Sequence, residues 1–478
     1  MAETLPIPAT QASRPTSEFS IIPDRSEIFR LGANQQTYAH QYSSIYFLRL
    51  TELRKTIEGV AGSKWGNLAR KPDYVKRVLD VTKGQLAYVI GTVYMEMPLK
   101  PSILEDIAKD EWTLAPPPKP RYYSDEDRIM LEDESGRVKL VGDVISKAQL
   151  VTGVIISALG METASGDFEV LDWCCAGLAE QSALKHRANG MEVDGAGLSS
   201  TASGEWIALV SGLDIGLPGP SAAEQDATDM SLQLLVEYLA SEAGGVEDQS
   251  SSSEISRLVI VGNSVVPVIS AEEEDTKSKR FNASKTKYDP APLNDLTALL
   301  TDISRAVPIH IVPGLTDPTG TTLPQQPLPR AMFGKELYKK PDTVFACETN
   351  PAWIGVGDCE MLAIAGQTID DLFKYVEGCD RMEMAKNTLK WRHMAPTAPD
   401  TLWCYPFLHR DPFMLEKTPH IYVIGNQPEF ASEILTNEEG DRRTRIILLP
   451  RFSQSGCLVL VNTETLEIKT VSFKVSGM

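Results

Sequence analysis

The sequence predicts two domains of different class, a small Greek-key β-barrel of the OB type followed by a layered α/β domain. Residues 84–182 contain five short apolar or β-branched runs separated by glycine turns, a pattern typical of such a barrel. From residue 204 onward, apolar strands alternate with amphipathic helices, and several strands end in loops rich in Gly, Asn, Ser or Pro. This alternation indicates stacked α/β layers. A chain of 478 residues is also too long for one ordinary domain.

The composition restricts the classes of function. A formal net charge of −19 disfavours a protein that grips nucleic acid on its own, because phosphate binding requires a basic surface. It favours protein partners. We see neither a secretory signal nor an apolar run long enough to span a membrane, so no membrane partner is expected. The seven cysteines form no CxxC pair, which predicts reduced thiols in an intracellular protein and no structural zinc site.

The two predicted domains are accompanied by three further segments. Residues 1–35 are expected to be a disordered tail, and residues 36–83 an N-terminal helical segment, with apolar residues recurring at helical spacing over 36–58. Residues 183–203 are polar and glycine-rich, which indicates a linker between the barrel and the α/β domain. Residues 270–289, rich in Glu and Lys without a large apolar run, are expected to be mobile.

The barrel carries the wrong charge for nucleic acid. OB folds that bind single strands do so through basic and aromatic residues on one face. The strands and turns predicted here instead carry six carboxylates, namely Glu132, Asp133, Glu134, Asp167, Glu169 and Asp172. We therefore interpret the barrel as a structural or protein-binding module, and a single-strand DNA-binding OB protein remains an alternative.

The α/β domain is predicted to begin with strands at 207–210, 257–261 and 309–312, joined by helices at about 227–240 and 293–303. We expect residues 244–253 to form a loop, and residues 443–449, 456–461 and 466–473 to form a closing antiparallel set. In α/β proteins, ligands bind where such strands end and loops begin. The strand-end loops are therefore the place to search for a site.

The strand-end loops resemble those of the calcineurin-like metallophosphoesterases. An active member has Asp-x-His after the first strand, Gly-Asp after the second, Gly-Asn-His-(Asp/Glu) after the third and Gly-His-x-His near the end. Those side chains hold two metals that activate a water.

In this chain most of the matching positions have lost their ligands. Ser211 and Leu213 replace the first Asp and His, and Asn263 replaces the second Asp. Leu315 and Thr316 replace the Asn-His pair and leave only Asp317, while Asn426 and Pro428 replace the last two histidines.

The resemblance therefore implies a retained fold with no metal, no cofactor and no catalysis. Of the six histidines, we place only His393 in a loop that could neighbour the site. An active metal-dependent phosphoesterase or nuclease that uses Asp317 remains an alternative.

Longer motifs narrow the resemblance. Residues 97–104 (MPLKPSIL), 131–134 (LEDE), 150–153 (LVTG), 323–328 (LPQQPL), 393–402 (HMAPTAPDTL) and 419–426 (PHIYVIGN) are similar to the small regulatory (B) subunits of eukaryotic DNA polymerase delta. The match covers about residues 36–478.

This second resemblance implies a nuclear, non-catalytic scaffold in DNA replication, repair and translesion synthesis. Its implied partners are the catalytic subunit's C-terminal metal-binding module and a third, elongated subunit. It also implies that the same subunit is a scaffold in polymerase zeta. Contact with DNA is implied to be indirect.

Overall fold

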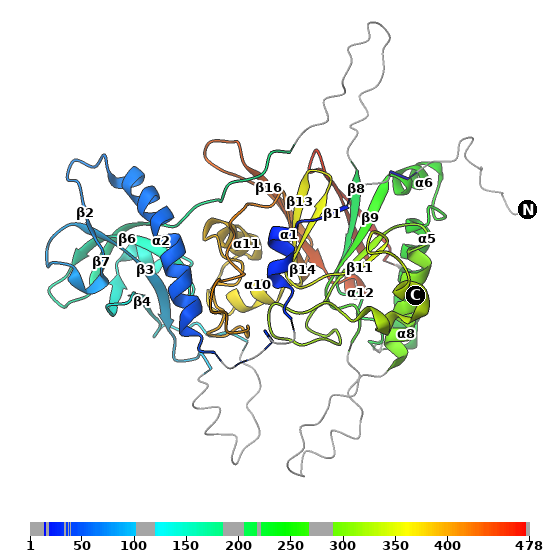
Figure 1. The fold of residues 1–478 in the computed structure, drawn as a ribbon, viewed down its shortest axis with the longest axis horizontal. Coiled ribbons are helices and arrows are strands. Elements are labelled where there is room, and N and C mark those ends of the chain that lie inside the picture. The colour runs from blue at the N-terminus through cyan, green and yellow to red at the C-terminus, as the bar shows by residue number, and fades with distance from the viewer. Residues whose placement is uncertain are drawn as a thin grey trace, which may run out of the picture.

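The computed structural model describes residues 14–15, 19–32, 35–36, 38, 40–101, 120–184, 205–217, 221–266 and 290–474. Figure 1 shows the barrel at one end of the long axis and the α/β domain at the other. Most of the predicted linker and all of residues 270–289 lie outside the described residues.

The first domain is a closed barrel, as predicted. Its sheet runs β2 (Asp73–Val75), β3 (Ala87–Glu96), β4 (Arg128–Glu132), β5 (Arg137–Val141), β7 (Phe168–Cys174) and β6 (Ile155–Glu162), and a β3–β6 pairing closes it. Strands β5 and β7 are parallel, whereas the other neighbours around the closed barrel are antiparallel. Strand β2 pairs with β3 although it lies within the segment 36–83, which we expected to be helical. The barrel sheet therefore includes residues before 84.

The predicted N-terminal helix is present but displaced along the sequence. Helix α2 spans Ser43–Trp65, later at both ends than the expected 36–58. It packs on β3 and β6, and the buried Ala61 and Trp65 extend its contact with the barrel. The Trp65 indole donates a 2.8 Å hydrogen bond to Asp172 of β7. Packing on the barrel thus sustains the helix past Gly59 and Gly62, which local propensity disfavours.

The prediction of a disordered tail is wrong for residues 19–32. This stretch forms β1 (Phe19–Ile21), α1 (Pro23–Ser26) and the 3-10 turn η1 (Glu27–Phe29), and β1 pairs antiparallel with β12 (Ala352–Val356). The Arg25 guanidinium donates two 2.9 Å bonds to the Glu360 carboxylate, and Phe29 is buried. These partners lie more than 300 residues away in the sequence, so local composition carries no sign of them. The tail residues 1–13, 16–18 and 33–34 lie outside the described part of the chain.

The α/β domain consists of two six-stranded sheets packed face to face. The first sheet has the order β11 (Phe345–Cys347), β10 (Ile309–Val312), β9 (Ile255–Val261), β8 (Trp206–Val210), β17 (Cys457–Asn462) and β18 (Ile468–Ser472). The second has the order β1, β12, β13 (Cys359–Ile364), β14 (Ile421–Gln427), β16 (Arg443–Pro450) and β15 (Ala431–Thr436). Apolar side chains from both, such as Leu209 and Val423, form the core between them.

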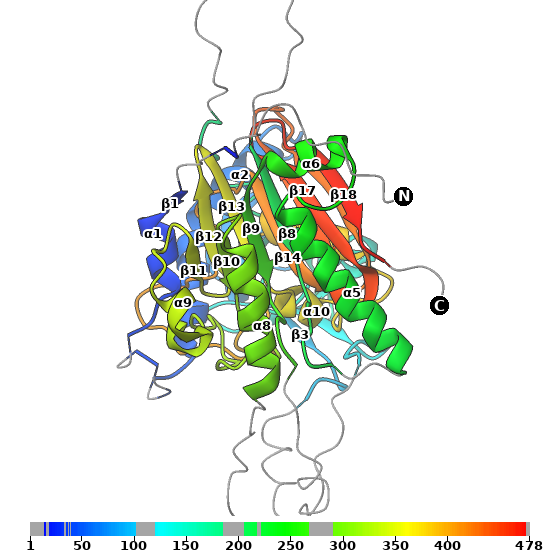
Figure 2. The same ribbon diagram turned by 90° about the vertical axis from the view of Figure 1, so that its right-hand side faces the viewer.

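Helices cover the outer faces of both sheets. Helices α5 (Ala222–Leu239) and α8 (Pro290–Ile303) lie on the first sheet, as Figure 2 shows, with α6 (Val246–Ser253) and α9 (Gly334–Tyr338) nearby. Helices α10 (Gln367–Leu372) and α11 (Arg381–Lys390) lie between the second sheet and the barrel (Figure 1). The short helices α4 (Asp143–Ser146), α12 (Phe452–Ser455) and the 3-10 turns η2 (Val78–Asp80) and η3 (Arg330–Phe333) complete the described elements.

One further prediction for this domain is wrong, and another is correct only in part. The segment 244–253, expected to be a loop, contains helix α6. Its polar sequence indicated exposure to solvent, but Ser252 and Ser253 are buried. The expected closing antiparallel set is confirmed for its last two strands, because β17 and β18 pair antiparallel in the first sheet. Strand β16 lies instead in the second sheet, where it pairs parallel with β14. Apolar periodicity reports that a strand is buried but not which sheet receives it.

The barrel and the α/β domain share one apolar core. Val89 and Leu131 of the barrel belong to the same buried cluster as Trp353 and Tyr422 of the second sheet. All seven cysteines are free in the structure. In the described part of the chain, no helix has the length and apolarity that crossing a membrane requires.

Candidate functional site

The loops after β8, β9 and β10 meet the last residues of β14 at the carboxyl ends of these strands. Strands β8, β9 and β10 are parallel neighbours, so their ends share one edge of the first sheet. The Ser211 hydroxyl donates a 2.7 Å bond to the Val261 carbonyl and accepts a 2.7 Å bond from the Asn426 backbone N–H. The Asn426 amide in turn donates to the Ala365 carbonyl at 2.8 Å. Ser211, Asn263, Asp317 and Asn426 are thus brought together across both sheets.

Asp317 is the buried anion of this site, and its carboxylate faces backbone amides. One oxygen accepts bonds from the N–H groups of Ser264 at 2.8 Å and Val265 at 3.1 Å. The other accepts a 2.7 Å bond from the Gly314 N–H. Burial raises the pKa of Asp317 to about 6, although the amide donors favour the charged form. The carboxylate therefore ties the β9 and β10 loops to each other.

The tight turns at this edge require unusual backbone geometry. Asn263, in the loop after β9, and Asn426, at a register shift within β14, both have left-handed φ angles, +54° and +57°, which Asn tolerates better than most residues. The Thr316 N–H donates to the Asn263 side-chain oxygen at 3.4 Å. A Cβ on Gly314 would lie 2.3 Å from the Asn263 backbone nitrogen, so only glycine fits there. The loops are closely packed against one another.

The remaining residues that we singled out at this edge cannot coordinate metal. Leu213 is buried in the apolar core beneath the helices of the first sheet. Leu315 is 57% exposed, and Pro428 is also exposed. Within the described residues no group of three or more His, Cys, Asp and Glu side chains could hold a metal ion. The donor set therefore does not fit the two metals of an active phosphoesterase.

His393, which we expected near this sheet edge, lies instead beside Asp411, the partner of Arg49 in helix α2. The Ala395 N–H donates to its Nδ1 at 3.1 Å, so Nε2 carries the proton and donates to Asp411 at 2.7 Å. Neither partner belongs to the strand-end network. Burial, reinforced by the positive charge of Arg49, lowers the pKa of His393 to about 4. The imidazole is therefore neutral at pH 7.

Arg49, which no sequence motif singled out, is a fully buried arginine where helix α2 meets both domains. Its guanidinium donates to Asp411 at 2.9 Å, to the Gly153 carbonyl of the barrel at 3.3 Å, and to the carbonyls of Pro396 and Ala398 at 2.7 and 3.0 Å. Burial alone would raise the pKa of Asp411, but His393 and Arg49 hold it well below its usual range. The only sequence signal was an arginine between the apolar Leu48 and Leu50 of the helix.

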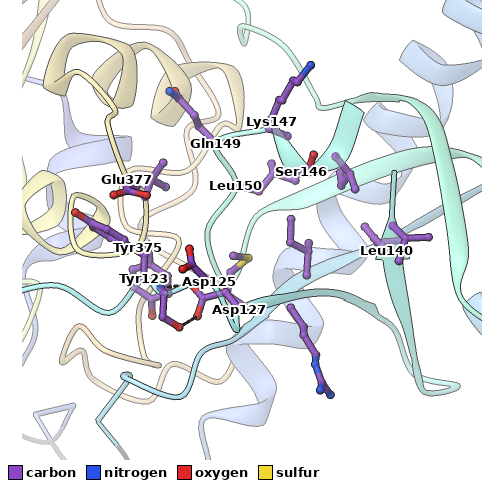
Figure 3. A pocket seen from close by; sticks show the side chains of 18 of the residues that line it. Tyr123, Asp125, Asp127, Leu140, Ser146, Lys147, Gln149, Leu150, Tyr375 and Glu377 are labelled. Carbon is purple, nitrogen blue, oxygen red and sulfur yellow. Dashed lines mark hydrogen bonds between the residues drawn. The ribbon is translucent and has the colours of Figure 1, made fainter. Parts of the chain in front are cut away.

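A cavity of about 830 Å³ lies between the barrel and the loop after α10. Its lining includes Asp125 and Asp127, which precede β4, and Tyr375 and Glu377 of the α/β domain (Figure 3). The walls are joined by the Tyr122 N–H, which donates to the Lys374 carbonyl at 2.7 Å. The lining also includes the cations Arg121, Arg128, Lys139 and Lys147. Because both acidic and basic side chains line the cavity, its charge favours neither a small anion nor a cation as a ligand.

Two family models match the chain, and they divide it as the structure does. A model described as the DNA polymerase delta subunit OB-fold domain matches residues 41–173. One that describes the B subunits of DNA polymerases alpha and epsilon matches residues 207–432. The first covers the barrel with helix α2, the second most of the α/β domain, and both describe subunits of DNA polymerases.

Whole-chain relatives are more specific. The chain is 36% identical to the DNA polymerase delta small subunit of Arabidopsis thaliana, with 96% of each chain covered. It is 35% identical to the rice small subunit, with 97% of this chain and 99% of the relative covered. The small subunit of Saccharomyces cerevisiae is 32% identical, with 97% and 96% covered. The chain therefore belongs to the family of DNA polymerase delta small subunits.

Proposed function

We propose that this accessory subunit of DNA polymerase delta acts as a non-catalytic scaffold in the nucleus. It joins the C-terminal metal-binding module of the catalytic subunit to a third, elongated subunit, in DNA replication, repair and translesion synthesis. It performs the same role for the catalytic subunit of polymerase zeta, and it contacts DNA only through its partners.

The environment of Asp317 is the observation that supports the absence of catalysis in this subunit. We infer that the α/β domain is an inactivated calcineurin-like phosphoesterase in which Asp317 is the surviving acidic position. Its two oxygens accept three backbone N–H bonds, whereas metal ligation would need further carboxylates and imidazoles around it. Leu213, Leu315 and Pro428 occupy ligand positions with side chains that have no donor atom. The retained loops hold the sheet edge together and carry out no hydrolysis.

The rigid joint between the domains supports the scaffold part. Arg49 of helix α2 bonds to both the barrel and the α/β domain, and the Lys100 ammonium forms a 2.7 Å ion pair with Asp400 across the same junction. The Gly153 and Pro396 backbones approach so closely that no side chain fits between them. Partners bound to the two domains would be held at a fixed relative position, which a scaffold requires.

Co-purification tests the proposal. Tagged C-terminal region of the catalytic subunit and untagged third subunit are produced with and without the full chain. We expect the third subunit to be retained on the resin only when the chain is present. Retention without the chain, or failure of the chain to bind the catalytic subunit's C-terminal region, would overturn the scaffold role.

A further inference from the structure

Large apolar side chains are exposed on two segments that contact each other. Trp403 is 75% exposed, Phe47 60%, Tyr38 55% and Leu408 39%. They belong to residues 38–49, around the start of helix α2, and residues 401–410, in the α/β domain. Single exposed apolar residues are ordinary, but four of them on two segments that contact each other mark an interaction surface. We name Tyr38, Phe47, Trp403 and Leu408 the aromatic patch.

The backbone beneath the aromatic patch is held in place. The Tyr38 ring stacks on Tyr405 with centroids 5.5 Å apart, and the Tyr42 hydroxyl donates to the Cys404 carbonyl at 2.9 Å. The Leu323 N–H donates to the Trp403 carbonyl at 2.9 Å, and the Tyr405 N–H to the Leu323 carbonyl at 3.1 Å. Trp403 is thus carried on a loop bonded on both sides while its own side chain remains in solvent. A fixed platform of this kind lowers the entropy lost on binding.

The surroundings of the aromatic patch differ in charge from the rest of the chain. The chain has 65 acidic and 46 basic residues, yet neither 38–49 nor 401–410 contains an Asp or Glu. The exposed polar side chains beside the patch include His40, His409 and Arg410. The flanking carboxylates are engaged elsewhere, Asp400 with Lys100 and Asp411 with Arg49. The patch is therefore an apolar surface with a neutral to basic rim on an acidic protein.

We propose that the aromatic patch is the docking surface for an amphipathic helix of a partner subunit, with an apolar face flanked by Asp and Glu. This inference rests on the proposed scaffold function. Exposed Trp and Tyr side chains are the usual anchors of protein interfaces, and apolar helix faces bind such surfaces. Acidic flanks complement the Arg410 rim and are repelled by the net negative charge of the chain, which guides the helix to the patch. A helix bound there contacts α2 and the α/β domain together.

The first test measures affinities of the full chain for the catalytic subunit's C-terminal region and for the third subunit separately. The double variant Trp403→Ala with Phe47→Ser is compared with Tyr338→Ala, which removes an equally exposed aromatic ring outside the patch. We expect the double variant to bind one of the two partners about 30-fold more weakly or worse and the control to bind as wild type. An unchanged thermal midpoint shows that the exposed substitutions leave the fold intact.

The outcomes separate the two proposals. If the wild type binds neither partner, the scaffold role fails. If it binds both and the double variant binds both equally well, the scaffold role stands and the docking surface is wrong.

A second arm uses model helices and does not depend on the partner subunits. Two labelled peptides, each about 18 residues or five helical turns long, present the same leucine face, one with Glu flanks and one with Lys flanks. The Glu peptide is expected to bind the wild type, to bind Arg410→Glu more weakly, and to lose affinity with added salt. Equal binding of both peptides, or equal binding of the Glu peptide to the double variant, contradicts the proposal.

Discussion

Arg49 of helix α2 and Asp411 of the α/β domain form a 2.9 Å ion pair between side chains that are 1% and 0% exposed. The same guanidinium also donates to backbone carbonyls of the barrel and of residues 396–398. A buried ion pair is not in itself a sign of high stability, because desolvation offsets the attraction. Removing one partner is costly, however, because the other is left charged in a dry interior.

Arg49→Ala should therefore lower the free energy of unfolding by about 3–5 kcal/mol, measured by urea titration. Arg54→Ala is the matched control on the same helix. Its ion pair with Glu134 is partly exposed, so its loss should cost about 1 kcal/mol or less. Equal effects of the two substitutions would mean that Arg49 does not hold the domains together.

Gly153→Ala tests the close approach of the domains. An added Cβ would lie 1.9 Å from the Pro396 carbonyl oxygen, and the φ of +92° is itself unfavourable for alanine. We expect a loss of more than about 3 kcal/mol in urea unfolding. Gly59→Ala, in helix α2 with open space around it, should instead stabilise by about 0.5–1 kcal/mol. A tolerated Gly153→Ala would show that the junction is looser than described.

Lowering the pH should reduce the free energy of unfolding through protonation of His393 in the unfolded chain. Its folded pKa is about 4, below its ordinary value near 6.5, so between these pH values the unfolded chain binds a proton that the native state refuses. The contribution of the neutral His393 side chain to the free energy of unfolding is fully present above pH 6.5. It is lost as the pH falls toward the folded pKa. Between pH 7 and pH 5 the loss is about 2 kcal/mol. His393→Gln should lose correspondingly less over this interval in paired urea titrations, and parallel pH profiles of the two proteins would refute the assignment.

Asp317→Ala removes the acceptor of three buried N–H groups. The free energy of unfolding should fall by about 1–3 kcal/mol or somewhat more, because those amides are left buried without this acceptor. Hydrolysis of bis(p-nitrophenyl) phosphate with Mn²⁺ should be at background for both the wild type and the variant. Turnover by the wild type that the variant abolishes would establish the phosphoesterase alternative in place of the scaffold.

The elements of both domains were largely predictable, because each buried strand and helix has its own apolar period. The barrel hairpin β4–β5 and the succession from β8 to β10 follow the sequence closely. The segments that could not be predicted depend on distant partners. Strand β1 exists because it pairs with β12, and α6 forms although its sequence is mostly polar.

The strand-end site was predictable as a location and as a set of residue types. Gly262, Gly314 and Gly425 mark the turns, and Leu213, Leu315 and Pro428 show from the sequence that metal donors are missing. That Asp317 binds three amides and that His393 lies apart from it could not be inferred, because both depend on loops distant in the chain.

The order of the domains, the positions of the strand ends and the types of side chain found there could all be inferred from the sequence, because they depend on residue identity and local spacing. The contacts that join the domains and the side chains left exposed on the surface became evident from the folded structure alone. An arginine on a helix is ordinarily expected in solvent, yet the fold surrounds Arg49 with Asp411 and three carbonyls. A tryptophan is ordinarily expected in a core, yet the loop of Trp403 leaves its side chain 75% exposed. Burial depends on contacts between segments that are distant in the sequence, so no local sequence pattern predicts it for these two residues.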